Sequence, residues 1–316
     1  MGALILSDLQ RDAKLIMISR GVRAFAFSYL TVVFAIYLSN LGYSTILIGI
    51  VFSVAYIASA VLGAVWGFLS DRYGRRRILI LLAVLTIFSN TIYLFFSHFL
   101  FILLAVIVAT VGAGGSGGGG QGGGPFNPVE HALLAEKCTP ENRNRVYSIN
   151  ACVGSVMGSL GALVSGLPQY LQEEWGWGVV ASYKPLFALT ILFSIGLIVV
   201  YSLISEEHTV VRAQRSPMSK KAGTFITRMS LLGIVDNLGA GLASPLVSYW
   251  FFLRFGVELK ALGVLFFLSY LFAALSFLTA PVIARYIGIV RTMVFSHGIA
   301  SILYLLLPFS PSFFIA

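Results

Sequence analysis

The sequence predicts an all-α integral membrane protein. The prediction rests on its composition, its long apolar segments and the placement of its charges. Of 316 residues, 58% are apolar and only 10% are charged, with a mean hydropathy of +0.91. Soluble domains have about 45–50% apolar and about 25% charged residues. A soluble globular domain and a disordered chain are therefore excluded, and two cysteines do not make a secreted disulfide scaffold.

Apolar segments long enough to cross a bilayer follow one another along the chain. A helix needs roughly 20 apolar residues to span the hydrocarbon core. About nine segments meet this condition, and we expect them at 15–38, 44–68, 77–97, 99–124, 146–169, 185–204, 223–251, 258–283 and 289–307.

Lysine and arginine gather in alternate loops between these segments. Fifteen of the 21 lie in the N-terminal segment and in the second, fourth, sixth and eighth loops, whereas Lys184, Arg254 and Lys260 lie in the loops between. This bias predicts a multi-pass protein of the cell membrane with a cytoplasmic N-terminus. The net charge of +9 then reflects topology, and no nucleic-acid partner is expected.

The fourth segment becomes glycine-rich over residues 112–124. A flexible linker would leave backbone groups unpaired in lipid, and a phosphate cradle would need a preceding strand and a Gly-Lys-Ser/Thr sequence. We therefore expect the tract to form the cytoplasmic half of the fourth helix. Small residues also recur in the fifth segment, from Gly154 to Gly161, where they predict close helix packing.

A weak internal repeat appears when the chain is shifted by 214 residues. Gly42 then meets Gly256, and Gly74 meets Gly288. The shift spans six expected helices, so the two copies are parallel, as in many transporters. The one long polar stretch divides the copies. We expect a six-helix bundle over 1–204, a cytoplasmic linker over 205–222 and a partial three-helix bundle over 223–316.

The loop between the second and third segments carries the most specific motif. It reads Gly67-Phe68-Leu69-Ser70-Asp71-Arg72-Tyr73-Gly74-Arg75-Arg76-Arg77 and resembles the signature loop of the major facilitator superfamily. The segment from Ala132 to Glu136, with Pro140 and Arg143, resembles the fourth-to-fifth connection of that family.

The resemblance implies major-facilitator-type helical bundles with twelve helices. The nine segments would then belong to a fragment or an incomplete gene product of a longer transporter. It also implies that Asp71 and the following arginines form a gating latch between the two bundles on the cytoplasmic side.

Ionisable residues within membrane segments are costly and are therefore candidates for a substrate or ion site. The first and seventh segments line the central cavity in the resembling family, and they carry the candidates Arg20, Arg23, Arg228, Asp236 and Asn237. Two further polar candidates on other segments are Gln121 and Asn150. Arg20 and Arg228 have the alternative of reaching lipid headgroups. Asp236 has two alternatives besides no role at all, a proton carrier or an ion pair with Arg23. A basic cavity would suit an anionic group.

The sequence thus predicts a secondary active transporter that moves a small solute by alternating access, coupled to protons. The alternative is an incomplete or non-transporting member of the same family. An enzyme is not expected, because the nearest acyltransferase-like spacing, His131 with Glu136, has Glu where that motif needs Asp. No cofactor and no metal site are predicted. The expected partners are the solute, protons and the lipid bilayer, and the sequence sets no oligomeric state.

Overall fold

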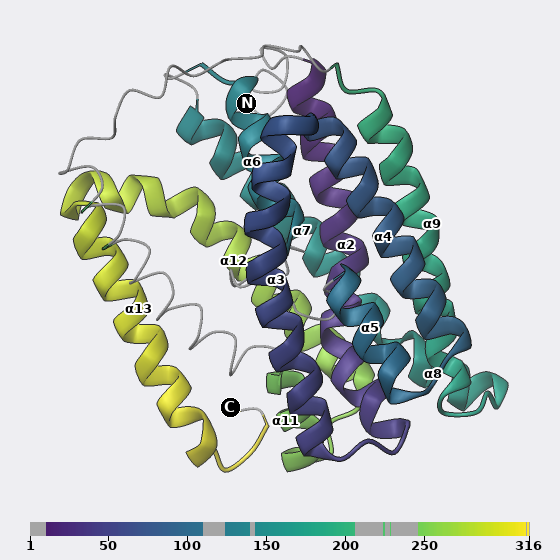
Figure 1. The fold of residues 1–316 in the computed structure, drawn as a ribbon. Coiled ribbons are helices and arrows are strands. Elements are labelled where there is room, and N and C mark those ends of the chain that lie inside the picture. The colour runs from purple at the N-terminus through teal and green to yellow at the C-terminus, as the bar shows by residue number, and fades with distance from the viewer. Residues whose placement is uncertain are drawn as a thin grey trace.

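The computed structural model describes residues 11–109, 124–139, 143–205, 246–313 and 315, together with residues 224 and 228. Every regular element in this part of the chain is a helix (Figure 1). Seven helical stretches within it are long and apolar enough to cross a membrane. The prediction of an all-α membrane protein is therefore confirmed. Most of the seventh expected segment, 223–251, lies outside the described residues.

The first helix, α2 (Arg11–Asn40), forms the centre of the first group of helices. It packs on α7 (Arg143–Leu163) and α9 (Lys184–Ser202), as Figure 1 shows. The most apolar 18-residue stretch of α2 is 78% buried, against 28% for that of α3 (Thr45–Tyr73). α2 is therefore the core of this group, whereas the more apolar α3 has a large free face, as a helix that borders lipid can have.

Two helical hairpins repeat with the offset of 214 residues. α3 and α12 (Leu259–Ile287) both contain 29 residues and start at equivalent positions. Each hairpin turns at a glycine with positive φ, +100° at Gly74 and +87° at Gly288, a backbone conformation that other residues rarely adopt. The helices that follow are α4 (Arg75–Phe95) and α13 (Ile289–Leu306). The predicted internal repeat is thus confirmed for these hairpins.

The fourth expected segment, 99–124, is described only over residues 99–109 and at residue 124. α5 ends at Ala109, the glycine tract up to residue 123 lies outside the described residues, and α6 (Phe126–Glu136) begins just after it. α6 runs along α3, because Pro128 lies against Gly63 and Gly67. α5 (Phe99–Ala109) packs on α4 and accepts a hydrogen bond of 2.8 Å from Ser89 at Ala105.

The second group consists of α11 (Val247–Phe255), α12 and α13. We call the end of the molecule with Gly74 and Gly288 the joint end. The opposite end, which carries α8 (Leu167–Trp175), is called the α8 end. There the Tyr249 hydroxyl donates to Ser39 over 3.3 Å, linking α11 to α2. Short helical turns complete the described elements: η1 (Val164–Gly166), η2 (Ala181–Tyr183) and η4 (Leu307–Phe309).

Candidate functional site

A cluster of buried charges joins α2 to α6. Arg20 and Arg23 lie three residues apart on one face of α2, and Asn127 and Glu130 have the same spacing on α6. Arg23 Nη2 pairs with Glu130 Oε2 in a close contact. Arg20 Nη1 donates to Asn127 Oδ1 over 2.7 Å and lies 3.9 Å from Glu130 Oε2. The three charged side chains are at most 2% exposed.

Neighbouring residues shape the space around the two arginines. A methyl group on Gly154 of α7 would lie 3.0 Å from Arg20 Nε, so the glycine makes room for this side chain. The Arg23 guanidinium lies over the ring of Phe126, 4.8 Å from its centroid, which favours the cation. Tyr201 of α9 also interacts with Arg23. Residues from four helices therefore converge on the cluster.

Among the described residues, this cluster contains two guanidinium groups and one carboxylate, all buried. Within the same part of the chain, Glu130 Oε1 has no hydrogen-bond partner. Buried ions are stable only when paired and hydrogen-bonded, so the two arginines depend on negative charge such as that of Glu130.

The cluster lies at membrane depth. Glu130 precedes Glu136, at the joint end, by six residues, a rise of about 9 Å along the helix. Arg23 is twelve residues into α2, a rise of about 18 Å from its first residue. Ionisable residues at membrane depth often mark a substrate pathway or a proton relay, so this cluster is a candidate site.

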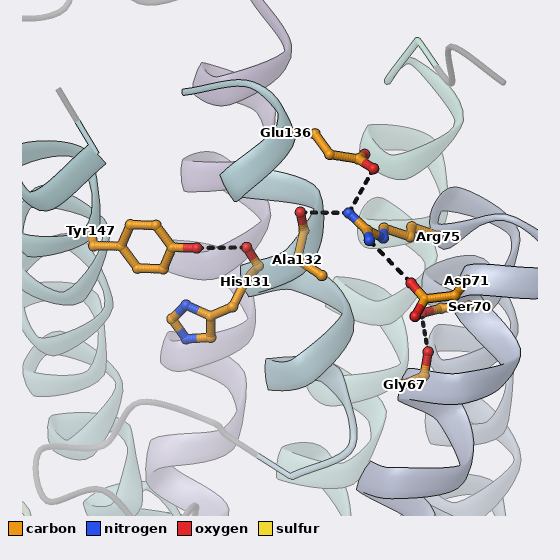
Figure 2. A network of polar contacts seen from close by, with 8 residues as sticks. All are labelled: Gly67, Ser70, Asp71, Arg75, His131, Ala132, Glu136 and Tyr147. Carbon is orange, nitrogen blue, oxygen red and sulfur yellow. Dashed lines mark hydrogen bonds and ion pairs between the residues drawn. The ribbon is translucent and has the colours of Figure 1, made fainter. Parts of the chain in front are cut away.

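A second polar network lies at the joint end, around Arg75 (Figure 2). Arg75 Nη2 contacts Asp71 Oδ1 at 3.0 Å, and Nη1 reaches Glu136 Oε1 at 2.8 Å and the Ala132 carbonyl at 2.6 Å. Ser70 donates to the Gly67 carbonyl over 2.7 Å and stabilises the end of α3. Arg75 thus fastens the α3–α4 turn to α6.

These contacts place part of the gating motif within the first group of helices. Asp71 remains 65% exposed, and the latch from Asp71 to a second bundle stays a prediction. Arg72 lies over the Tyr73 ring at 5.5 Å, Arg77 is exposed, and Arg76 is partly exposed.

The other candidate residues have mixed outcomes. Arg20 is buried against α6, so the alternative in which it reaches headgroups is wrong. Arg228 is exposed, and Asn150 is buried in α7, where its Oδ1 has no partner among the described residues. Gln121, Asp236 and Asn237 lie outside the described residues.

The pairing of Arg23 with Glu130 was not expected from the sequence, which offered Asp236 as its partner. Glu130 and Asn127 are not among the candidates from the sequence, because the sequence predicts a loop after the glycine tract. Their spacing of three residues, matching that of Arg20 and Arg23, was the available signal.

His131 and Glu136 contact different partners. Their spacing is the nearest match to an acyltransferase motif. The His131 ring stacks on Tyr147 at a centroid distance of 5.3 Å, and the Tyr147 hydroxyl donates to the His131 carbonyl. Glu136 instead binds Arg75. As Figure 2 shows, the two side chains do not face each other, so they form no acid–base pair.

Comparison with known proteins agrees with this architecture. A membrane protein of Saccharomyces cerevisiae, the uncharacterized YJR124C, is 24% identical, and the alignment covers 96% of this chain and 74% of the yeast protein. The crystal structure of a D-xylose–proton symporter superposes with a TM-score of 0.56 at 15% identity, covering 87% of this chain and 69% of the symporter, and so shares the fold. The model of the Major Facilitator Superfamily matches residues 16–316. This chain therefore belongs to the Major Facilitator Superfamily of membrane transporters.

Proposed function

We propose that this protein is a secondary active transporter that moves a small anionic solute by alternating access, coupled to protons. The observation that carries the proposal is the buried contact of Arg23 with Glu130, beside Arg20. The fold shared with a proton symporter is consistent with it. In the same proposal the joint end faces the cytoplasm of the cell membrane, since basic loops stay on that side.

The charge balance suggests how proton and solute are coupled. When Glu130 is ionised, it neutralises Arg23. Protonation of Glu130 removes its negative charge from beside the two buried guanidinium groups, and an anionic group on the solute then replaces the carboxylate. Carboxylate and phosphate groups suit arginine, because both accept paired hydrogen bonds from its planar donors. Asp236 stays a second candidate for the proton carrier.

The test is Glu130→Gln in the full-length protein, reconstituted in vesicles that contain a pH-sensitive dye. Carboxylates and phosphate esters are supplied outside, and proton entry and uptake of labelled solute are measured together. The amide cannot exchange a proton, so we expect solute-dependent proton entry to be lost while solute exchange remains. Glu174→Gln, on the exposed end of α8, is the matched control.

Two outcomes contradict the proposal. Unchanged proton entry in Glu130→Gln removes this residue from coupling and turns attention to Asp236. Absence of any solute flux in the parent protein favours the alternative, a non-transporting member of the family. Arg20→Gln and Arg23→Gln separately test the anionic solute, because either change should raise the KM for an anion more than that for a neutral compound.

A further inference from the structure

A polar cluster at the α8 end connects the two groups of helices. Gln169 of α8 donates from Nε2 to Glu173 Oε1 over 2.7 Å and to Glu258 Oε2 over 2.6 Å. Its other amide atom, Oε1, accepts a hydrogen bond of 3.0 Å from the backbone N–H of Lys260. The Lys260 ammonium pairs with Glu173. One carboxamide thus uses both its donor and its acceptor across the boundary between α8 and α12.

The contact with the Lys260 N–H has the form of a helix cap. The first amides of an α-helix lack partners within the helix, and a side chain at the N-cap position usually accepts one of them. The N-cap residue of α12 is Glu258, and its side chain makes no such hydrogen bond. Lys260 is the second residue of α12, so Gln169 supplies from another helix the acceptor that Glu258 does not supply.

Beneath this cap α12 touches the end of α7 and the η1 turn through small residues. A methyl group on Gly263 of α12 would lie 2.9 Å from the Ala162 carbonyl and 2.8 Å from Ser165 Oγ. A methyl group on Gly166 would lie 3.3 Å from the Lys260 Cα. Leu259 and Leu262 are buried beside this contact. At the α8 end α12 is therefore in tight contact with α7 and η1, beneath the polar cluster around Gln169.

We propose that Gln169 is the positioning residue that holds the α8 end closed, by capping α12 from the opposite group of helices. Opening this end must break the cap and expose the Lys260 N–H and the contact below it. The inference rests on the proposed alternation of access. The free energy that holds the α8 end closed comes mainly from the cap. The Lys260–Glu173 pair is about 45% exposed, and exposed ion pairs contribute little.

Opening can be measured with a buried cysteine reporter. In the full-length protein, Cys138 and Cys152 are replaced by serine, and Ser165, which is fully buried at the contact with Gly263, is changed to cysteine. A charged, membrane-impermeant thiol reagent then modifies the reporter only when the α8 end opens. The modification rate therefore reports the population of the open state.

Four variants separate the cap from its surroundings. Gln169→Leu removes the acceptor, and Lys260→Pro removes the donor N–H at a position in the first turn where proline is tolerated. Both should raise the modification rate about fivefold, the usual effect of losing a cap. Lys260→Gln keeps the N–H and should change the rate less than about twofold. Gln172→Leu should leave it unchanged, since Gln172 binds Ser182 within the first group.

Unchanged rates in both Gln169→Leu and Lys260→Pro would overturn the inference. Equal increases in Lys260→Pro and Lys260→Gln would also overturn it, because the ion pair would then carry the effect. The outcome is independent of the transport assay. If the rates rise as expected while no anionic solute is moved, the cap stands and the proposed function fails.

Discussion

Gly154 and Gly161 lie two turns apart on α7 and illustrate how single residues set the packing around α2. A methyl group on Gly161 would overlap the Phe25 carbonyl oxygen, which is rigid backbone. On Gly154 it would meet only the Arg20 side chain, which can move. The prediction of close packing through small residues in the fifth segment is confirmed at both positions.

Alanine at these two glycines should therefore have unequal effects. Gly161→Ala should lower the free energy of unfolding by about 1–3 kcal/mol through overpacking, and Gly154→Ala by clearly less. Thermal unfolding in detergent measures the difference. Gly196→Ala is the control, because a methyl group there has open space in α9 and should be neutral or slightly stabilising. Equal losses of unfolding free energy in Gly154→Ala and Gly161→Ala would contradict the prediction, because α2 would then move away from α7 at little cost.

Among the elements, α3 and α6 show what sequence patterns can and cannot reveal. α3 is a long apolar helix, and its expected range of 44–68 comes close to the observed Thr45–Tyr73. α6 has only eleven residues, and Glu130 and His131 interrupt its apolar pattern. Its ionised residue is tolerated because Arg23, 107 positions away, neutralises it. The apolar pattern of α6 alone cannot reveal such a pairing, for which the matching spacing of three residues on α2 and α6 is the only sequence signal.

Cys138 lies two residues beyond the end of α6 and is partly buried. Partial burial raises the pKa of the Cys138 thiol, with a smaller opposing effect of Arg143. Because the thiolate is the reactive form, a maleimide should label Cys138 more slowly than a free cysteine at pH 7, and the difference should shrink as the pH rises through the raised pKa.

The labelling is measured in a Cys152→Ser background with an impermeant maleimide. With the joint end in the cytoplasm, inside-out vesicles should be labelled and intact cells should not. Labelling of intact cells would reverse the proposed orientation. A rate that equals that of a free cysteine at pH 7 would show that Cys138 is not partly buried.

Over the whole molecule, the composition and the long apolar segments predicted the all-α membrane fold, while the partners of the buried charges had to come from the structure. The arginines of the signature loop were found because their motif is contiguous. Their partner Glu136 lies 61 residues beyond Arg75, on the far side of the glycine tract, and belongs to the same network. The fold was thus readable from composition and periodicity, and the candidate site only in part.

Removing the centre of this network should affect stability and transport together. Arg75→Gln breaks contacts with Asp71, Glu136 and the Ala132 carbonyl, and should cost about 1–2 kcal/mol of unfolding free energy. Arg77→Gln, at an exposed site, is the control.

Asp71→Asn should lower transport while membrane insertion stays intact, as measured by uptake at equal protein level. Wild-type uptake in Asp71→Asn would restrict the loop to setting topology.

The equal lengths of α3 and α12 bear on how such a chain can evolve. The two hairpins share few residues, yet each keeps 29 residues before its glycine joint. One inserted residue would rotate every later side chain by about 100° around the helix axis and shift it by about 1.5 Å. Buried faces would then turn toward lipid. These hairpins should therefore tolerate many substitutions but few insertions or deletions. The equal helix lengths can then indicate a duplication even where few identical residues remain.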